Sequence, residues 1–263
     1  MSRALHLSTS SVNPMKTETT FIAAAEAGYK GVELMISPSK ETQNLNHIKD
    51  LIQKYSIPVT SIHAPTLLLC KFVWGTNPGR KLSKSVEFAE QVGATSVVVH
   101  PPFMTNPYAA KFLTNVKQLN DNSVVDVAVE NMFPWAFKGH SKEMYGPSWD
   151  ETISTADNLT FDFSHASLSG MDVMKFFTEY HHKVRVIHLT DGSSRTNSKA
   201  DSIKDEHLIP GEGDMPIREV YELLNENNWS GDTVLEINTR QHSTLEQKLP
   251  ALVSSMAFFN SIN

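Results

Sequence analysis

Cysteine is nearly absent from this sequence of 263 residues, which contains Cys70 and no other. A single cysteine cannot form an intramolecular disulfide, so the composition gives no support for an oxidising compartment. Long apolar runs are also missing: no stretch reaches the roughly 18 uninterrupted apolar residues of a membrane span, and no apolar core follows a basic start as in a secretory leader. We therefore expect a cytoplasmic protein that does not enter a membrane.

Positive charge is in short supply. The chain has 23 Lys and Arg against 29 Asp and Glu, a formal net charge of -6. Because binding to nucleic acid depends on Lys and Arg displacing condensed counterions, this balance makes nucleic acid an unlikely partner. With 40% apolar and 20% charged residues, and ordinary numbers of Gly and Pro (12 and 13), disorder and low-complexity filaments are excluded. The length suits one globular domain spanning residues 1–263.

The pattern of apolar residues predicts strand and helix in alternation, eight times over. The expected strands are 4–8, 31–35, 59–63, 96–100, 124–130, 159–162, 184–189 and 233–237. The expected helices are 17–27, 44–55, 80–92, 108–119, 149–154, 172–180, 216–227 and 244–259.

Two α/β architectures use this alternation. Runs such as Val97-Val98-Val99 indicate a parallel sheet covered on both faces. A doubly wound open sheet would usually carry a Gly-rich phosphate turn after an early strand, but Ser8, Thr9 and Ser10 follow the first strand here. We therefore predict a (β/α)8 TIM barrel, with the doubly wound sheet as the alternative.

The carboxyl end of every predicted strand carries a side chain that can bind a metal or transfer a proton. These residues are His6, Glu33, His63, His100, Glu130, Asp162, His188 and Glu236. So many ionisable groups at one barrel mouth would be costly without a compensating positive charge, and Lys and Arg do not gather at these ends. A bound divalent metal is the simplest compensation, and imidazole with carboxylate is the ligand mix of zinc, manganese or iron.

Two short motifs add further possible ligands. Asp162 and His165 form D-x-x-H just after a strand, and Asp205 and His207 form D-x-H in a long polar segment. Each motif is weak alone, so their position beside the strand ends carries the argument. In a barrel, loops at those ends build the active site.

With these residues in view, the chain resembles the xylose isomerase-like TIM barrels, the superfamily that joins endonuclease IV with sugar isomerases and epimerases. The likeness covers nearly the whole length. The matching stretches are SIHAP at 61–65, VVHPP at 98–102, AVENM at 128–132, FDFSHA at 161–166, VIHLTDG at 186–192, DEHLIPGEGD at 205–214 and VLEIN at 234–238.

Similarity to endonuclease IV implies a cluster of three metals and a phosphoester hydrolase of the AP endonuclease type. Its nine ligands fall on His63, His100, Glu130, Asp162, His165, His188, Asp205, His207 and Glu236. Where those enzymes wedge side chains into DNA, this chain has Ala64, Pro65 and Thr66.

Similarity to the isomerase and epimerase branch implies a single metal on Glu130, Asp162, His188 and Glu236. Both glutamates act there as acid and base on either side of the reacting carbon, and His165 contacts a substrate oxygen. An arginine of that branch has Arg195 as its nearest counterpart, one position away. Trp135, in a loop after a strand, can stack on a sugar face.

Two functions follow. The favoured one is a metal-dependent isomerase or epimerase of a small sugar or sugar phosphate, acting by proton abstraction through an enediolate. It would use one to three zinc or manganese ions, with Glu130 and Glu236 as catalytic residues and with His6, Glu33, Trp135 and Arg195 contacting substrate. The alternative is the metal-cluster phosphoester hydrolase. Phe258 and Phe259, near the end of the chain, either cover the barrel or pair with a second chain in a homodimer.

Overall fold

The fold is a closed barrel of eight parallel strands, seen in a computed structural model that describes residues 3–66, 70–137, 140–194 and 205–263. Neighbouring strands follow the order β1-β10-β9-β8-β5-β4-β3-β2. The strands are β1 (Leu5–Ser8), β2 (Val32–Met35), β3 (Val59–His63), β4 (Ser96–Val99), β5 (Asp126–Glu130), β8 (Leu159–Asp162), β9 (Val184–Leu189) and β10 (Asp232–Leu235). The predicted TIM barrel is confirmed, and closure of the sheet excludes the doubly wound alternative.

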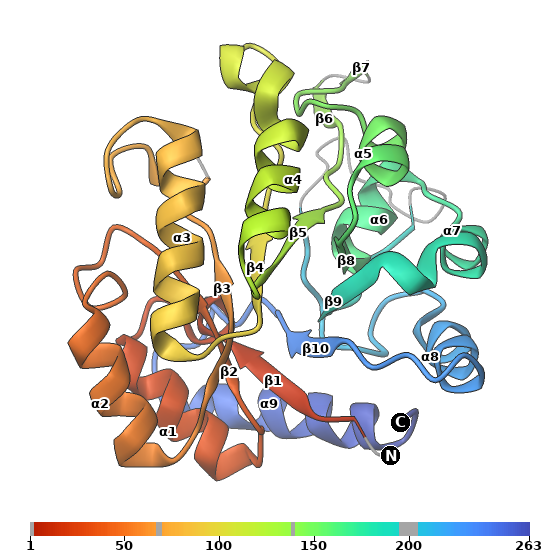
Figure 1. Cartoon of the computed structure of the whole chain (residues 1–263). Coiled ribbons are helices and arrows are strands. Elements are labelled where there is room, and N and C mark those ends of the chain that lie inside the picture. The colour runs from red at the N-terminus through yellow and green to blue at the C-terminus, as the bar shows by residue number, and fades with distance from the viewer. Residues whose placement is uncertain (1–2, 67–69, 138–139, 195–204) are drawn as a thin grey trace.

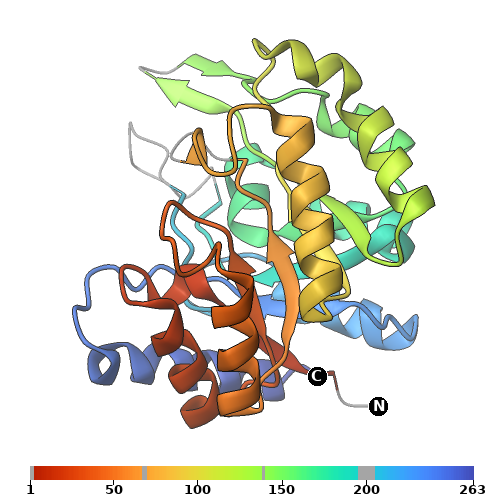
Figure 2. The ribbon, with the colours of Figure 1, turned by 60° about the vertical axis from the view of Figure 1, so that its left-hand side comes forward.

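Helices surround the barrel, as Figures 1 and 2 show from two sides. They are α1 (Thr17–Ala27), α2 (Leu45–Tyr55), α3 (Pro78–Val92), α4 (Phe112–Asn122), α5 (Trp149–Thr155), α6 (Phe163–Ser169), α7 (Val173–Tyr180), α8 (Ile217–Glu226) and α9 (Leu245–Asn260). Short 3-10 helices lie at η1 (Thr9–Val12), η3 (Pro107–Lys111) and η4 (His181–Lys183).

Local sequence signals set several helix ends. The side chains of Asn44, Asn77 and Thr244 each accept a hydrogen bond from a backbone N–H in the first turn of α2, α3 and α9. Gly28 and Gly93 end α1 and α3 in the left-handed conformation, which costs glycine little. These caps explain why the predicted helix boundaries lie close to the observed ones.

Apolar side chains occupy two separate regions. The main core lies between the strands and the helices and includes Val97, Phe161 and Leu235. A second, smaller cluster consists of Val98, Val186 and Val234, which come from β4, β9 and β10. Successive residues of a strand face opposite sides of the sheet, so these valines belong to the barrel interior.

Two features were missed by the sequence prediction. A hairpin of β6 (Trp135–Phe137) and β7 (His140–Lys142) follows β5, and α6 directly follows β8.

The two ends of the chain meet on one side of the molecule (Figures 1 and 2), where the Arg3 backbone N–H donates to Asn263 Oδ1 at 3.2 Å. In the described part of the chain, none of the helices has the length and apolar character needed to cross a membrane.

Candidate metal centre

Six buried side chains converge at the carboxyl ends of the strands. Three end their strands, namely His63 in β3, Glu130 in β5 and Asp162 in β8. His188 lies near the end of β9, while His100 and Glu236 each follow a strand by one residue. All six are less than 9% exposed. Parallel strands bring distant parts of the chain to one mouth, so the barrel itself assembles this cluster.

His188 lies at the centre of the carboxylates. Its Nδ1 is 3.2 Å from Glu130 Oε1, 3.0 Å from Glu236 Oε2 and 3.6 Å from Asp162 Oδ2. One ring nitrogen carries at most one proton and donates it to one acceptor well, so it does not satisfy three carboxylates. The arrangement is therefore a convergence of ligand atoms rather than a set of ordinary hydrogen bonds.

Glu130 joins this group to a second one. Its Oε2 lies 2.8 Å from His100 Nε2 and 3.3 Å from His63 Nε2, and its Oε1 lies 3.3 Å from His165 Nδ1. The ligand atoms of His63, His100 and Glu130 all lie within 4.8 Å of one another. Glu130 is thus placed to bridge two adjacent positions for a cation.

A capping interaction explains the D-x-x-H motif. Asp162 is the N-cap of α6, and its Oδ1 accepts from the His165 backbone N–H at 2.8 Å. The same carboxylate leaves Oδ2 directed at the cluster, while the first turn of α6 brings His165 beside it. Because the cap requires Asp three residues before His165, the motif arises from the geometry of a helix start.

A third group comes from the segment after β9. Asp191 and Leu208 exchange backbone hydrogen bonds of 3.0 and 2.9 Å, which hold the returning chain beside the barrel. Asp205 Oδ2 then lies 2.8 Å from His207 Nε2 and 3.3 Å from His165 Nε2. Ser164 supports this carboxylate through a hydroxyl that donates to Asp205 Oδ1 at 2.7 Å.

Backbone carbonyls determine which nitrogen of two histidines faces the site. His165 Nδ1 lies 2.9 Å from the Asn131 carbonyl oxygen, and His207 Nδ1 lies 2.9 Å from the Glu236 carbonyl oxygen. A carbonyl oxygen only accepts, so each Nδ1 must carry its proton in those contacts. The Nε2 atoms of both rings, which face Asp205 Oδ2, are then the nitrogens that can bind a metal.

Proton affinities in the cluster are strongly perturbed. Burial disfavours the charged form of His165, but Asp162 and Asp205 outweigh burial and raise the pKa to about 10. Burial acts likewise on His188, yet the nearby glutamates raise its pKa well above the ordinary value. His100 differs, because burial lowers its pKa despite Glu130. Excess negative charge therefore dominates most of the site, which favours binding a cation.

The residues fit a divalent metal. Glu130 Oε2 and Asp162 Oδ2 are buried and receive no hydrogen bond of good geometry, and His100 Nδ1 also lacks a partner. In the part of the chain that the structure describes, no Lys or Arg forms an ion pair with the carboxylates of the cluster. Buried carboxylates without a cationic partner are costly, and a metal with oxygen and imidazole ligands removes that cost.

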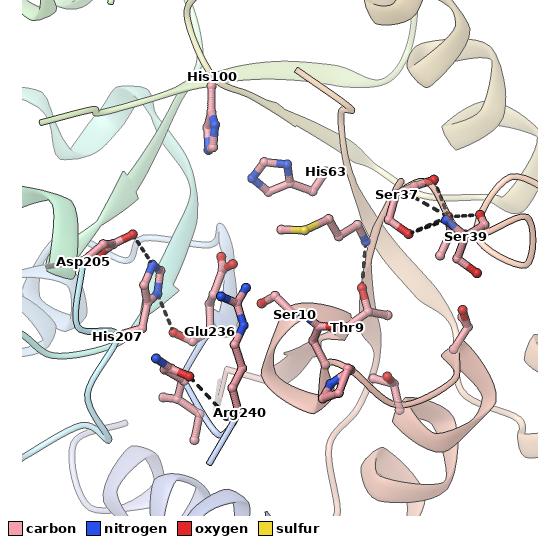
Figure 3. A pocket seen from close by; sticks show the side chains of 18 of the residues that line it. Thr9, Ser10, Ser37, Ser39, His63, His100, Asp205, His207, Glu236 and Arg240 are labelled. Atoms are coloured by element: carbon pink, nitrogen blue, oxygen red, sulfur yellow. Dashed lines mark hydrogen bonds and ion pairs between the residues drawn. The ribbon is translucent and has the colours of Figure 1, made fainter. Parts of the chain in front are cut away.

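A cavity of about 550 Å³ opens above the cluster. In Figure 3, His63, His100, His207 and Glu236 extend toward the same space, and Ser37 and Ser39 lie on its far side. The volume lies in the range of small-molecule sites. Histidines and carboxylates therefore line one side of a cavity large enough for a sugar.

The residues predicted to contact substrate are scattered. His6 lies at the amino-terminal side of the barrel, where its Nε2 is 3.4 Å from Asp232 Oδ1. Glu33 is fully buried below His188, and neither His6 nor Glu33 lines the cavity. Trp135 is 43% exposed, packs edge-on against Phe103 and does not line the cavity. Arg195 lies outside the described residues.

Several lining residues were not singled out from the sequence. Lys16 and Arg240 bring positive charge to the rim, and Tyr145 and Phe133 bring aromatic rings. Each follows the carboxyl end of a strand, but in a loop whose path the strand pattern does not define. The only signal in the sequence for Lys16 and Arg240 was that they follow the strands β1 and β10.

Residues 21–262 match the family model described as xylose isomerase-like TIM barrel. The chain belongs to that family. An uncharacterised protein of Mycobacterium tuberculosis is 36% identical to it over 272 aligned positions, covering 96% of this chain and 95% of the relative. Fructoselysine 3-epimerase of Shigella flexneri is 20% identical, covering 84% and 85% of the two chains. Inosose dehydratase of Lacticaseibacillus casei is 22% identical, covering 83% and 82%.

Solved structures of the same fold cover nearly the whole chain. The IolI protein, crystallised with a zinc atom, superposes with a TM-score of 0.75 at 14% identity, covering 98% of both chains. A D-tagatose 3-epimerase-like protein superposes with a TM-score of 0.67 at 18% identity, also covering 98% of both. At these identities, the superpositions establish the barrel fold.

Proposed function

We propose that this protein is a divalent-metal-dependent isomerase or epimerase of a small sugar or sugar phosphate. The observation that carries the proposal is the convergence of Glu130, Asp162 and Glu236 on His188 Nδ1, at the edge of a sugar-sized cavity. These four residues would hold the metal, zinc or manganese by their ligand types. When bound, the metal would act as a Lewis acid that polarises the carbonyl and hydroxyl oxygens of the substrate.

The two glutamates supply the proton chemistry. Both line the cavity, so both are accessible to a bound substrate. Burial raises the pKa of Glu236, but His188 and His207 outweigh burial and hold it below the ordinary value, so this carboxylate is deprotonated at neutral pH. It is therefore ready to remove a proton from carbon, while Glu130 exchanges the proton on the other side.

The family context supports this assignment. Fructoselysine 3-epimerase and inosose dehydratase, two relatives of similar length, have names that describe chemistry on polyhydroxylated compounds. The IolI structure holds zinc on the same fold. A soluble sugar-like substrate is also consistent with the hydroxyl side chains of Ser37 and Thr42 along the cavity wall.

The direct test is proton exchange. Protein purified without chelator is incubated in D2O with a panel of ketoses and sugar phosphates, and NMR follows deuterium at the carbon next to the carbonyl. We expect deuterium incorporation and a new epimer or isomer for at least one compound, both lost on chelation and restored by zinc or manganese. No exchange with any compound, in protein loaded with either metal, contradicts the proposal.

A second function is favoured by the additional ligands. The ligand atoms of Asp162, His165 and His207 lie within 4.8 Å of one another, as do those of His63, His100 and Glu130. Three metal positions suit a phosphoester hydrolase, in which clustered metals stabilise attacking and leaving oxygens. Bound metal near three equivalents, with cleavage of an abasic DNA duplex, supports this function. Bound metal near one equivalent, without cleavage, supports the isomerase.

A further inference from the structure

Glu33 is a buried carboxylate that the proposed reaction leaves unused. It lies in β2, has no exposed surface and does not line the cavity. The Ser61 hydroxyl donates to Glu33 Oε2 at 2.8 Å, and His188 Nε2 lies 3.2 Å from Oε1 and 3.3 Å from Oε2. A carboxylate oxygen of Glu33 also lies within 4.8 Å of one of Glu236. In the described part of the chain, no Lys or Arg forms an ion pair with Glu33.

The position of Glu33 relative to His188 is specific. His188 directs Nδ1 at Glu130, Asp162 and Glu236, and it directs the opposite nitrogen at Glu33. Imidazole binds a metal through an unprotonated nitrogen, so the proton must reside on Nε2 when Nδ1 is the ligand. A carboxylate accepts that proton in a hydrogen bond and does not donate one when ionised.

Two other histidines of this mouth, His165 and His207, show the same arrangement with a different acceptor. His165 and His207 each place Nδ1 on a backbone carbonyl and direct Nε2 at the site. His188 reverses the two nitrogens, and the backbone is replaced by the side chain of Glu33. Because a charged acceptor makes a stronger hydrogen bond than a carbonyl, Glu33 also increases the electron density available at Nδ1.

We propose that Glu33 is a positioning residue that fixes the His188 ring with its proton on Nε2, so that Nδ1 faces the metal. Ser61 in turn holds the Glu33 carboxylate in place through its hydroxyl. This inference rests on the proposed function, since it concerns the metal held by Glu130, Asp162, His188 and Glu236. Glu33 touches neither substrate nor metal in this role and acts through His188.

Three variants separate charge from position. Glu33→Gln keeps the size of the side chain and removes the charge. Glu33→Asp keeps the charge and withdraws the carboxylate by one methylene from His188. Asp232→Asn is the matched control, because Asp232 also faces a histidine inside this barrel, His6, but at the opposite end.

The measurement is zinc affinity, by competition with a chromophoric chelator, together with thermal melting of the metal-free proteins. We expect both Glu33 variants to bind zinc about 10- to 100-fold more weakly than wild type, the usual effect of losing such an outer partner. Asp232→Asn is expected to bind zinc within about threefold of wild type. Lower melting temperatures for the Glu33 variants without weaker zinc binding would overturn the assignment and leave Glu33 a structural residue.

Histidine NMR supplies a second readout. Long-range ¹H–¹⁵N correlations of the zinc-loaded wild type should show His188, assigned by the loss of its signals in His188→Gln, with the proton on Nε2. A proton on Nδ1 overturns the assignment. Wild-type protein that binds no zinc overturns the proposed function as well, whereas equal zinc affinity of wild type and Glu33→Gln overturns only the role of Glu33.

Discussion

The interior of the barrel contains two layers of opposite character only two residues apart. Val98, Val186 and Val234 form a buried apolar cluster. Two positions further along the chain from these valines are His100, His188 and Glu236, which belong to the candidate metal centre. Along each of these three segments, one inward-facing residue is a packed valine and the next is a candidate metal ligand.

This contrast separates stability from chemistry. The valines gain free energy by leaving water, and their contacts do not depend on pH or on metal. The histidines and carboxylates lose hydration on burial and regain it through one another or through a cation. We therefore expect substitutions in the valine layer to reduce the free energy of unfolding, and substitutions in the ligand layer to reduce function.

The largest effect is expected for Glu236→Gln, because it removes a residue proposed both to bind the metal and to act as the catalytic base. Turnover should fall at least 100-fold, at the low end of the contribution of general acid–base catalysis. Val234→Ala, on the same strand, is the matched control and should keep most of the turnover per folded molecule. Steady-state kinetics on the substrate found by deuterium exchange checks both, and similar losses for the two variants would contradict the separation of layers.

The next effect concerns stability. Val186→Ala removes buried methyl groups from the apolar layer, and we expect a loss of about 2 kcal/mol in the free energy of unfolding. For a chain of this size that corresponds to a fall of roughly 4–8 °C in melting temperature. Denaturant titration measures the loss, and zinc competition on the folded variant should give the wild-type affinity. Weaker zinc binding would show that the layers are coupled.

The pH dependence of stability should differ with and without metal. The pKa of His165 in the folded, metal-free protein is about 10, above the roughly 6.5 of an unfolded histidine. A raised folded pKa contributes stability that is complete below about pH 6.5 and is lost as the pH rises toward 10. The melting temperature of chelated protein should therefore fall between about pH 6.5 and 9.

Metal binding should have the opposite pH dependence, because an imidazole binds a metal only through an unprotonated nitrogen and zinc therefore binds more tightly as the pH rises. The rise in melting temperature produced by zinc should be larger at pH 8 than at pH 6. Calorimetry of chelated and zinc-loaded samples across this range measures both slopes. The Val186→Ala protein should show the same slopes at a lower temperature, and a stability of chelated protein that is independent of pH would contradict the interpretation.

The smallest effect is expected at the other end of the barrel. His6 pairs with Asp232 there, away from the cavity. His6→Asn should cost at most about 1 kcal/mol of stability, the upper end for an ion pair with a partly exposed partner, and should leave zinc affinity and turnover unchanged. A clear loss of turnover would instead support the prediction that His6 contacts the substrate.

Most of the fold could be predicted because its signals are local. The alternation of apolar runs with amphipathic segments predicted every barrel strand, and in the structure caps such as Asn77 and Gly93 fix the helix ends locally. The β6–β7 hairpin and α6 were missed for different reasons. The hairpin segment is only three residues per strand, and α6 begins on the residue after β8, with Asp162 serving both elements.

The residue types of the candidate site could be predicted from the sequence, but the direction in which each side chain points could not. Strand-end position placed Glu130 and His188 at one mouth, as the structure shows. The same position failed for His6, whose side chain lies at the amino-terminal side, and for Glu33, whose carboxylate lies beneath the ligands. His6 and Glu33 each lie two residues before the last residue of β1 or β2, one inward-facing layer short of the mouth, and the sequence alone does not show where each strand ends.

Local patterns in the sequence are enough to predict a barrel with histidines and carboxylates at the carboxyl ends of its strands, because alternation and residue type are properties of short segments. Which nitrogen of His188 meets three carboxylates and which meets Glu33 is visible only in the folded chain. The same holds for the contacts of the Asp205 carboxylate with both His165 and His207. Those relations depend on strand register and ring orientation, which arise when segments far apart in the chain pack together.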